Sequence, residues 1–310
     1  MLYKKAGIFI TAVSAIGFGS MTVLAQLAYA SGANTMDLLT IRFTVAALIF
    51  GIIIGCMALT NHLKWQLSWK QVLTLIALGA SGYGIFSSMY FHGVSLIPAS
   101  LAGFLLFTYP VMVCILAYFL GEEPVDSQKI LALAVSLCGS IFVLGPVVED
   151  VNWEGVTFVM LAAFLYSLYV VGSSRILKDV HWFPASAILT ISCAGFFLGR
   201  ELIFNNGYNL ANINDEIMFY GVILGVFSTL IAIACFYLGL SLIGPSRASI
   251  ISTLEPVSSA CLAALIFNEQ LSILQLIGAS CILLSILIIQ KARDEDNVVS
   301  SNRYHRERQA

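Results

Sequence analysis

Charged residues are scarce in this chain. Only 10% of the 310 residues are Asp, Glu, Lys or Arg, whereas 59% are hydrophobic, and the formal net charge is −2. Soluble domains carry about 25% charged residues, so most of this chain is not suited to contact with water. The nearly balanced charge also excludes bulk electrostatic attraction to nucleic acid. The composition therefore predicts an integral membrane protein.

Paired cysteines, metal-ligand clusters and catalytic motifs are also absent from the sequence. The seven cysteines are scattered singly through apolar runs, with no CxxC pair and no Cys/His cluster, so we predict neither a disulfide framework nor a zinc site. No Lys follows a Gly, which excludes a Walker A motif and ATP drive within this chain, and no HExxH motif occurs. We therefore expect a protein that is not an enzyme and that carries no metal or cofactor.

Long apolar runs are what the sequence does contain. A helix needs about 20 apolar residues to cross a bilayer core about 30 Å thick. Charged, Pro, Gly and Asn positions divide the chain into ten such runs, which cover residues 6–29, 37–59, 69–91, 98–120, 127–146, 154–174, 182–204, 217–240, 247–268 and 272–290. The first run follows Lys4 and Lys5, but it is longer than the 7–15-residue apolar core of a signal peptide. We interpret it as the first membrane helix of an all-α protein.

A segment of the first half recurs in the second half at a constant offset. Residues 93–123 align without gaps on residues 239–269, 146 positions later, and 11 of the 31 aligned residues are identical. Residues 7–21 correspond in a similar way to residues 155–169. Repeats of this kind are common in transporters. We predict two five-helix repeats, residues 1–146 and 152–290, followed by a polar cytoplasmic tail at residues 291–310.

The distribution of Lys and Arg predicts the orientation of these repeats. If the amino terminus is cytoplasmic, the inside segments hold 13 of the 15 Lys and Arg residues, and the exceptions are Arg42 and Arg200. This asymmetry places both termini in the cytoplasm. Because each repeat has an odd number of helices, the second repeat must then be inverted relative to the first.

Glu255 is the ionisable residue that lies deepest in an apolar run. It is about eight residues into the run 247–268, which corresponds to about 12 Å along a helix and places it near the middle of the membrane. A charge at that depth is costly and usually functional, so we predict that Glu255 binds substrate or a proton. The alternative is a protonated Glu255 that bonds to carbonyl groups freed by Pro256.

Matched prolines and several polar side chains accompany Glu255. Pro110 and Pro256 each remove a helical hydrogen bond and are expected to kink their helices, with or without a role in gating. We predict a substrate cavity between the repeats, lined by the first, third, fourth, sixth, eighth and ninth runs. The predicted lining residues besides Glu255 are Tyr83, Tyr109, Tyr166 and Gln26.

Three further charged residues lie near predicted helix ends. Arg42 is near the outer end of the second run, where we expect its side chain to reach the membrane surface. The alternative for Arg42 is pairing with Asp37 or with a substrate carboxylate. Glu123 and Glu269 lie beside short loops, and we expect these carboxylates to bond to loop backbone amides.

These motifs resemble the drug/metabolite transporter superfamily. The resemblance rests on ten helices in two halves, on the Tyr109-Pro110 and Glu255-Pro256 pairs, and on the acidic residue that follows each. Within the superfamily the chain is most similar to the bacterial EamA-type permeases, over about residues 6–290. The second half matches best, through Pro245-Ser246-Arg247-Ala248 and Leu254-Glu255-Pro256. The first half departs in having Tyr109 where many members carry another residue before the proline.

The resemblance implies a secondary transporter that works by alternating access and exports amino acids or related small metabolites across the bacterial inner membrane. It leaves the substrate, the direction and the coupling ion open, with protons as the candidate ion. The alternatives are an uptake permease for a nutrient or a nucleotide-like metabolite, and a membrane sensor or scaffold that transports nothing. The expected partners are a small-molecule substrate and the lipid bilayer, with no nucleic acid, in a monomer or homodimer.

Overall fold

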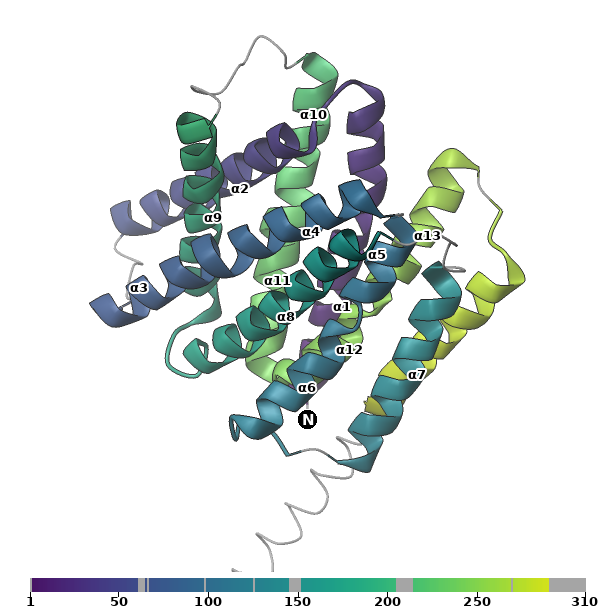
Figure 1. Ribbon diagram of the computed structural model, residues 1–310. Coiled ribbons are helices and arrows are strands. Elements are labelled where there is room, and N and C mark those ends of the chain that lie inside the picture. Colours follow the sequence, from purple (N-terminus) through teal and green to yellow (C-terminus); the bar gives the residue numbers. More distant parts are fainter. Residues whose placement is uncertain are drawn as a thin grey trace, which may run out of the picture.

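Helices make up every regular element in the part of the chain that the structure describes. The computed structural model (Figure 1) describes residues 2–60, 65, 67–97, 99–124, 126–144, 152–204, 214–268 and 270–289. Nine apolar helical segments within these ranges are 18 residues or longer, and a tenth, Ile273–Ile289, is slightly shorter. The predicted all-α membrane protein with ten apolar helices in two repeats is therefore confirmed. The predicted tail at residues 291–310 lies outside the described residues.

The helices follow the predicted runs in order. The first half contains α1 (Leu2–Ala30), α2 (Thr35–Leu59), the continuous segment α3 (Trp69–Ala77), η1 (Leu78–Gly84) and α4 (Ile85–Leu96), then α5 (Ala99–Leu106), α6 (Tyr109–Phe119) and α7 (Ser127–Leu144). The second half contains α8 (Trp153–Ile176), α9 (Trp182–Phe204), the segment α10 (Asp215–Ile223), η3 (Leu224–Ile231) and α11 (Ala232–Ile243), then α12 (Pro245–Ser252), α13 (Leu254–Phe267) and the helix Ile273–Ile289.

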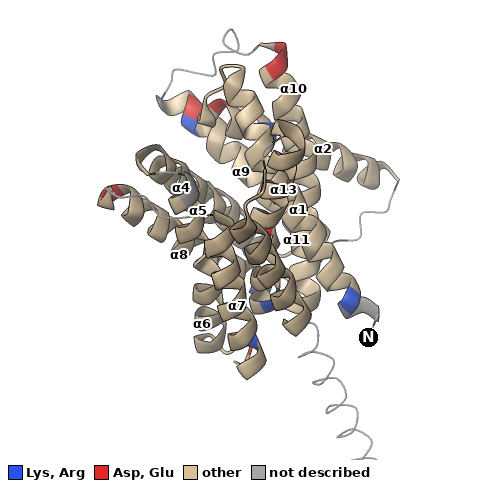
Figure 2. Ribbon diagram, turned by 90° about the vertical axis from the view of Figure 1, so that its right-hand side faces the viewer, with Lys and Arg blue, Asp and Glu red and all other residues tan. Residues whose placement is uncertain are grey.

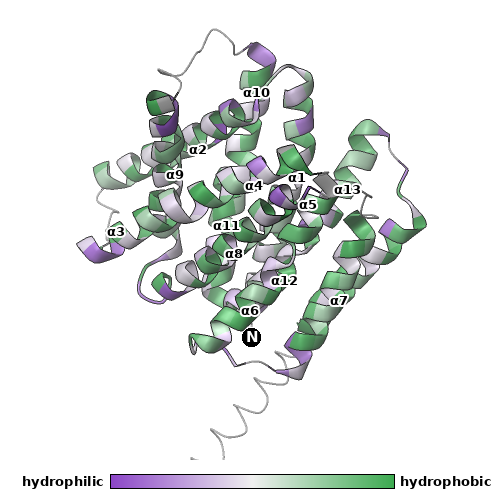
Figure 3. Ribbon diagram, in the orientation of Figure 1, coloured by the Kyte–Doolittle hydropathy of each residue, from purple (hydrophilic) through white to green (hydrophobic). Residues whose placement is uncertain are grey.

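The outer surface of the bundle is apolar. Large hydrophobic side chains such as Leu59, Phe119 and Leu202 are exposed, whereas many serine and threonine side chains are buried. Hydrophobic residues predominate along the helices in Figure 3, and charged residues lie mainly at helix ends in Figure 2. A water-soluble protein shows the opposite pattern, since it exposes charge and buries its large apolar groups. The arrangement suits helices surrounded by lipid.

The two halves contact each other through equivalent residues. Gly7 on α1 lies against Leu242 and Ile243 at the end of α11, and Gly155 on α8 lies against Leu96 and Ile97 at the end of α4. The two contacted pairs are separated by the same 146 positions as the sequence repeat. The first helix of each half therefore packs on the third membrane segment of the other half. Reciprocal contacts of this kind are what a two-fold relationship between repeats produces.

Both third segments contain a π-helix at the same place in the repeat. The π-helical turns η1 and η3 begin at Leu78 and Leu224, which again are 146 residues apart. In η3 the Thr229 hydroxyl donates to the carbonyl of Leu224, five residues earlier, at 3.0 Å. The sequence predicts ordinary helix in both regions. Single π-turns within α-helices often occur at functional sites, and η1 carries Tyr83.

The helices that contain Pro110 and Pro256 are interrupted just before each proline. The first interruption separates α5 from α6 at Phe107 and Thr108, and the second separates α12 from α13 at Thr253. At each interruption a threonine hydroxyl donates to the carbonyl three residues earlier, from Thr108 to Leu105 at 2.7 Å and from Thr253 to Ile250 at 2.6 Å. Local side-chain bonds thus satisfy carbonyl groups near the breaks, as the membrane interior requires.

Candidate functional site

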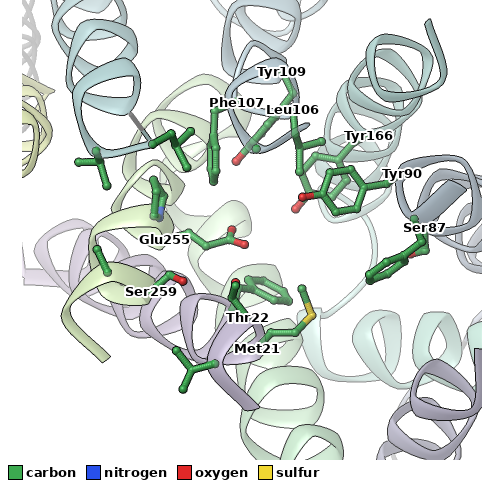
Figure 4. Close-up of a pocket in the computed structure, with 18 of the residues that line it drawn as sticks. Met21, Thr22, Ser87, Tyr90, Leu106, Phe107, Tyr109, Tyr166, Glu255 and Ser259 are labelled. Carbon is green, nitrogen blue, oxygen red and sulfur yellow. The ribbon is translucent and has the colours of Figure 1, made fainter. Parts of the chain in front are cut away.

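A cavity of about 300 Å³ lies between the two halves, and both halves line it. The first half contributes residues of α1, α2, η1, α4, α5, α6 and the end of α7, and the second half contributes residues of α8 and α13 (Figure 4). The lining residues that carry the argument below are Met21, Gln26, Arg42, Tyr83, Phe86, Tyr90, Tyr109, Tyr166, Glu255 and Ser259. A concave, largely apolar site with a few convergent polar groups is typical of a small-molecule binding site.

The structure brings together every binding residue that the sequence predicted. Glu255, Tyr83, Tyr109, Tyr166 and Gln26 all line the cavity. Figure 4 shows the Glu255 carboxylate pointing into the open space, toward the hydroxyl groups of Tyr109 and Tyr166. Among the described residues, no side chain lies within ion-pair distance of the Glu255 carboxylate, which makes no hydrogen bond with them either. Its carboxylate is therefore available to a solute in the cavity.

The interruption at Thr253 places Glu255 at this point. Glu255 lies in the first turn of α13, where the backbone amides of a helix end have no intrahelical partners and carry partial positive charge. A carboxylate is favoured there. The neighbouring helix α1 approaches closely because it carries Gly19, whose α-carbon faces the carbonyl oxygen of Glu255 and the side chain of Ser258. Glu255 is thus held at a tight crossing of helices from different halves.

Aromatic rings form the wall opposite Glu255. The ring of Tyr166 lies 4.6 Å from Phe86 and 4.7 Å from Tyr109, measured between centroids, and the second pair has an edge-to-face geometry. The ring of Tyr83 lies 5.4 Å from Phe86. The Tyr109 hydroxyl also donates to the backbone carbonyl of Ser249 on α12, at 3.4 Å. Aromatic pairs in these geometries stabilise one another, so the wall is a packed surface for the apolar part of a solute.

Arg42 lies inside the protein rather than at the membrane surface. Its side chain is buried and lines the cavity, so the expectation that it reaches the membrane surface is wrong. The guanidinium group contacts the sulfur of Met21 on α1 and lies 4.6 Å above the ring of Phe43. Arg42 is two turns into α2, and its side chain points inward, across to Met21 on α1. Periodicity gave no reliable signal for that face because α2 is apolar all round.

The segment 217–240 does not line the cavity, contrary to the sequence prediction. Its inner face packs on α1 instead, where Ser14 donates to the carbonyl of Ala232 at 2.7 Å and the hydroxyls of Ser20 and Ser228 lie 2.9 Å apart. Helix α1 therefore separates this segment from the cavity. The second run takes its place in the lining through Arg42, and the end of α7 contributes Val143 and Leu144.

Ion pairs join the two halves at the opposite end of the bundle. We call this end the N-terminal face and define it by the start of α1 and by the ends of α6, α8 and α11. The Glu122 carboxylate, after α6, binds Arg175 and Lys178 near the end of α8. Partial burial alone raises the pKa of the Glu122 carboxyl, but hydrogen bonds from Arg175 and Lys178 outweigh it and lower the pKa below its usual 4.5.

Glu123 is held differently from the sequence prediction. Its carboxylate pairs with Lys129 at 3.0 Å and lies against Gly244, the residue that precedes α12. The Lys129 ammonium also donates to the carbonyl of Pro124 at 2.8 Å. The expected bonds to loop amides are replaced by this ion pair because Lys129 comes within reach one turn into α7. Glu269, the equivalent residue of the second half, lies outside the described residues.

Comparison with known proteins identifies the family. Residues 5–145 and 153–290 match the EamA-like transporter family. The uncharacterized transporter sll1319 of Synechocystis sp. is 24% identical, over 91% of this chain and 92% of the relative. An uncharacterized transporter of Clostridium kluyveri is 25% identical, over 95% and 96%. A crystal structure with 18% identity superimposes with a TM-score of 0.77, covering 92% of this chain and 96% of that one, which shows a shared fold. The chain therefore belongs to the EamA-like transporter family and is a multi-pass membrane transporter.

Proposed function

We propose that this protein is a secondary active transporter that exports small metabolites, amino acids or related compounds, across the bacterial inner membrane. The observation that carries the proposal is the carboxylate of Glu255, which faces a cavity between two related halves and has no partner among the described side chains. A carboxylate inside a membrane protein is expensive unless it serves a solute or a proton. An exported compound with an amino group is a suitable partner for it.

The arrangement of the halves supports alternating access. On α1 the cavity is lined by residues from Phe18 to Gln26, and on α13 by Glu255 and residues that follow it, so these parts of the lining lie away from the N-terminal face. Lys and Arg residues favour a cytoplasmic N-terminal face. With that orientation, the cavity is available from outside the cell, and the ion pairs of Glu122 and Glu123 lie on the cytoplasmic side. This is the state from which an exporter releases its substrate.

Glu255 has one of two chemical roles in this cycle. As a carboxylate it binds the amino group of the metabolite by a charge-assisted hydrogen bond. As a proton carrier it takes up a proton from outside after the substrate leaves and returns the proton to the inside during the next step. In either role, the charge of Glu255 is balanced by whatever occupies the cavity, a substrate or a proton. This charge lies at the crossing of α1 and α13, where Gly19 contacts Glu255.

Flux measurements on Glu255→Gln in proteoliposomes test the proposal. Glutamine is nearly isosteric with glutamate but does not ionise, so we expect a folded protein that has lost net transport driven by a proton gradient. Substrate-for-substrate exchange separates the two roles: it continues in Glu255→Gln if Glu255 only carries protons, and it stops if Glu255 binds the substrate. Glu154→Gln is the matched control, because Glu154 is exposed at the start of α8. Wild-type net flux in Glu255→Gln would disprove both roles.

A tolerance screen tests direction and identifies the substrate. Cells that overproduce an exporter should survive higher concentrations of toxic amino-acid analogues than cells without the gene. Increased sensitivity to an analogue would instead indicate an uptake permease for a nutrient or nucleotide-like metabolite. If purified protein in proteoliposomes moves none of the compounds that alter growth, the chain is a sensor or scaffold. Both termini should be inaccessible to impermeant reagents added outside intact cells.

A further inference from the structure

We propose that Arg42 is the anion-binding residue of the cavity, and that Arg42 and Glu255 together select zwitterions that carry both a carboxylate and an ammonium group. This inference rests on the proposed function, because it names the chemistry of the solute that the cavity accepts. Its basis is a buried cation and a carboxylate that line one cavity and come from different halves of the protein, α2 and α13.

Arg42 has no anionic partner in the described part of the chain. No carboxylate of those residues lies within ion-pair distance of its guanidinium, and its Nε has no hydrogen-bond partner. A buried charge is costly when it is unpaired. Arg42 contacts the sulfur of Met21, the ring of Phe43 and the hydroxyl of Tyr83, and none of these groups is an anion. A ligand carboxylate in the cavity provides the missing anion.

Packing around Phe43 fixes the guanidinium in place. The ring of Phe43 stacks on Phe197 with centroids 5.4 Å apart and planes 14° apart, and it meets Tyr83 edge-on at 5.6 Å. Because Phe43 is fully buried between these rings, the Arg42 group above it has a rigid support. A planar guanidinium held in one orientation can bind both oxygens of a carboxylate, whereas a lysine ammonium provides only a point charge.

The two charges and the aromatic wall together describe the solute. A carboxylate bound at Arg42 and an ammonium bound at Glu255 leave the rest of the molecule beside Phe86, Tyr109 and Tyr166. A compound with only one of the two charges would leave either Arg42 or Glu255 unsatisfied, which lowers its affinity relative to the zwitterion. A bound zwitterion would also link α2 of the first half to α13 of the second half, so its arrival and departure alter the contact between the halves.

Ligand-induced thermal stabilisation of the purified, detergent-solubilised full chain tests this inference. The probes are the twenty proteinogenic amino acids and 5-aminovalerate, which vary the distance between the two charges. Each zwitterion that stabilises the wild type is then compared with the corresponding amine that lacks the carboxylate and the acid that lacks the amine. We expect Arg42→Gln to weaken binding of the zwitterion and the acid by about 30-fold and to change binding of the amine by less than about twofold, since one charge-assisted bidentate contact is lost.

Glu255→Gln should show the reverse pattern, with weaker binding of the zwitterion and the amine and unchanged binding of the acid. Arg42→Lys keeps the charge and loses the planar fork, so we expect an intermediate loss of about tenfold for the acid. Lys70→Gln, which removes an exposed cation at the start of α3, is the control and should bind all three ligands as the wild type does. The melting temperature of ligand-free Arg42→Gln should not fall, because an unpaired buried cation has been removed.

Several outcomes would overturn the inference. One is equal weakening of zwitterion, acid and amine in Arg42→Gln, which would indicate a general packing role. A second is an affinity for the acid that is unchanged in both Arg42→Gln and Arg42→Lys. A third is a wild-type protein whose melting temperature is raised by no zwitterion and no carboxylate. These results are distinct from failure of the proposed function. If proteoliposomes with the wild-type protein show no flux, transport is disproved even where Arg42 binds the acid. If flux depends on Glu255 but binding of the acid does not depend on Arg42, only the present inference is disproved.

Discussion

Glu122 in the first half binds Arg175 near the end of α8 in the second half, and the same carboxylate also binds Lys178. This contact lies on the N-terminal face, away from the residues that line the cavity. If the halves exchange conformations, the cavity must open on the N-terminal face and the helix ends there must separate. The ion pairs of Glu122 therefore stabilise the state that the structure shows at the expense of the opposite one.

The first prediction is that Glu122→Gln shifts the protein toward the opposite state. Arg175 and Lys178 are about half exposed, so the two pairs together contribute about 1 kcal/mol, which changes the ratio of the two states about fivefold. Labelling of Ser87→Cys, a cavity position, in a background without other cysteines should become faster from the N-terminal face and slower from the other face. The charge-swapped pair Glu122→Arg with Arg175→Glu should restore most of the original rates, and unchanged labelling in Glu122→Gln would exclude a role in gating.

The second prediction concerns the pH dependence of this contact. Because hydrogen bonds from Arg175 and Lys178 outweigh the effect of burial, the pKa of Glu122 in the folded protein is below its usual 4.5. For a depressed pKa, the stabilisation is complete above the unfolded value and is lost as the pH falls through the folded value. The difference in melting temperature between wild type and Glu122→Gln should stay constant from about pH 8 to about pH 5.5 and shrink below about pH 4.5. A difference that shrinks near neutral pH would mean that another group controls the contact.

The third prediction tests the crossing of α1 and α13. A β-carbon on Gly19 would lie 2.6 Å from the carbonyl oxygen of Glu255 and 2.7 Å from the β-carbon of Ser258, so Gly19→Ala forces the two helices apart. We expect a loss of about 1–3 kcal/mol in stability and reduced flux, because Glu255 moves with α13. Gly55→Ala is the control, since a β-carbon there meets nothing within 4 Å. Equal melting temperatures for the two variants would show that the crossing adjusts without strain.

The sequence predicts the membrane fold and most of the cavity because both depend on strong local signals. Ten apolar runs and the 146-residue offset define the helices and their pairing, and the reciprocal contacts of Gly7 and Gly155 follow from that duplication. Glu255 and the tyrosines stand out because polar groups inside apolar runs are rare. Each of those residues lines the cavity.

What the sequence does not predict depends on which helix face turns inward. The sequence of a uniformly apolar helix does not show which of its faces turns toward the protein interior. For this reason the sequence predicts neither the burial of Arg42 nor the position of the segment 217–240 behind α1, away from the cavity. The π-helical turns that begin at Leu78 and Leu224 are not predicted either. A π-turn differs from an α-turn by one additional residue between hydrogen-bonded groups, and no particular amino-acid composition signals this difference.

The last prediction concerns the paired helix interruptions before Pro110 and Pro256. In Pro110→Ala and Pro256→Ala the missing amide is restored, so α5 can join α6 and α12 can join α13 as continuous helices. Each proline lies in the first turn of its second helix, where it is well tolerated, so we expect little change in melting temperature. A continuous helix would redirect Tyr109 or Glu255, and the added backbone hydrogen bond would have to break whenever the helix bends during exchange between states. Net flux should therefore fall about tenfold in each variant, as for a barrier raised by about the worth of one hydrogen bond. Because the two interruptions are equivalent in the repeat, the two variants should be impaired to a similar degree. Wild-type flux in both would show that the interruptions only serve packing, and impairment of Pro256→Ala alone would show that the break matters for placing Glu255 and not for the motion of the halves.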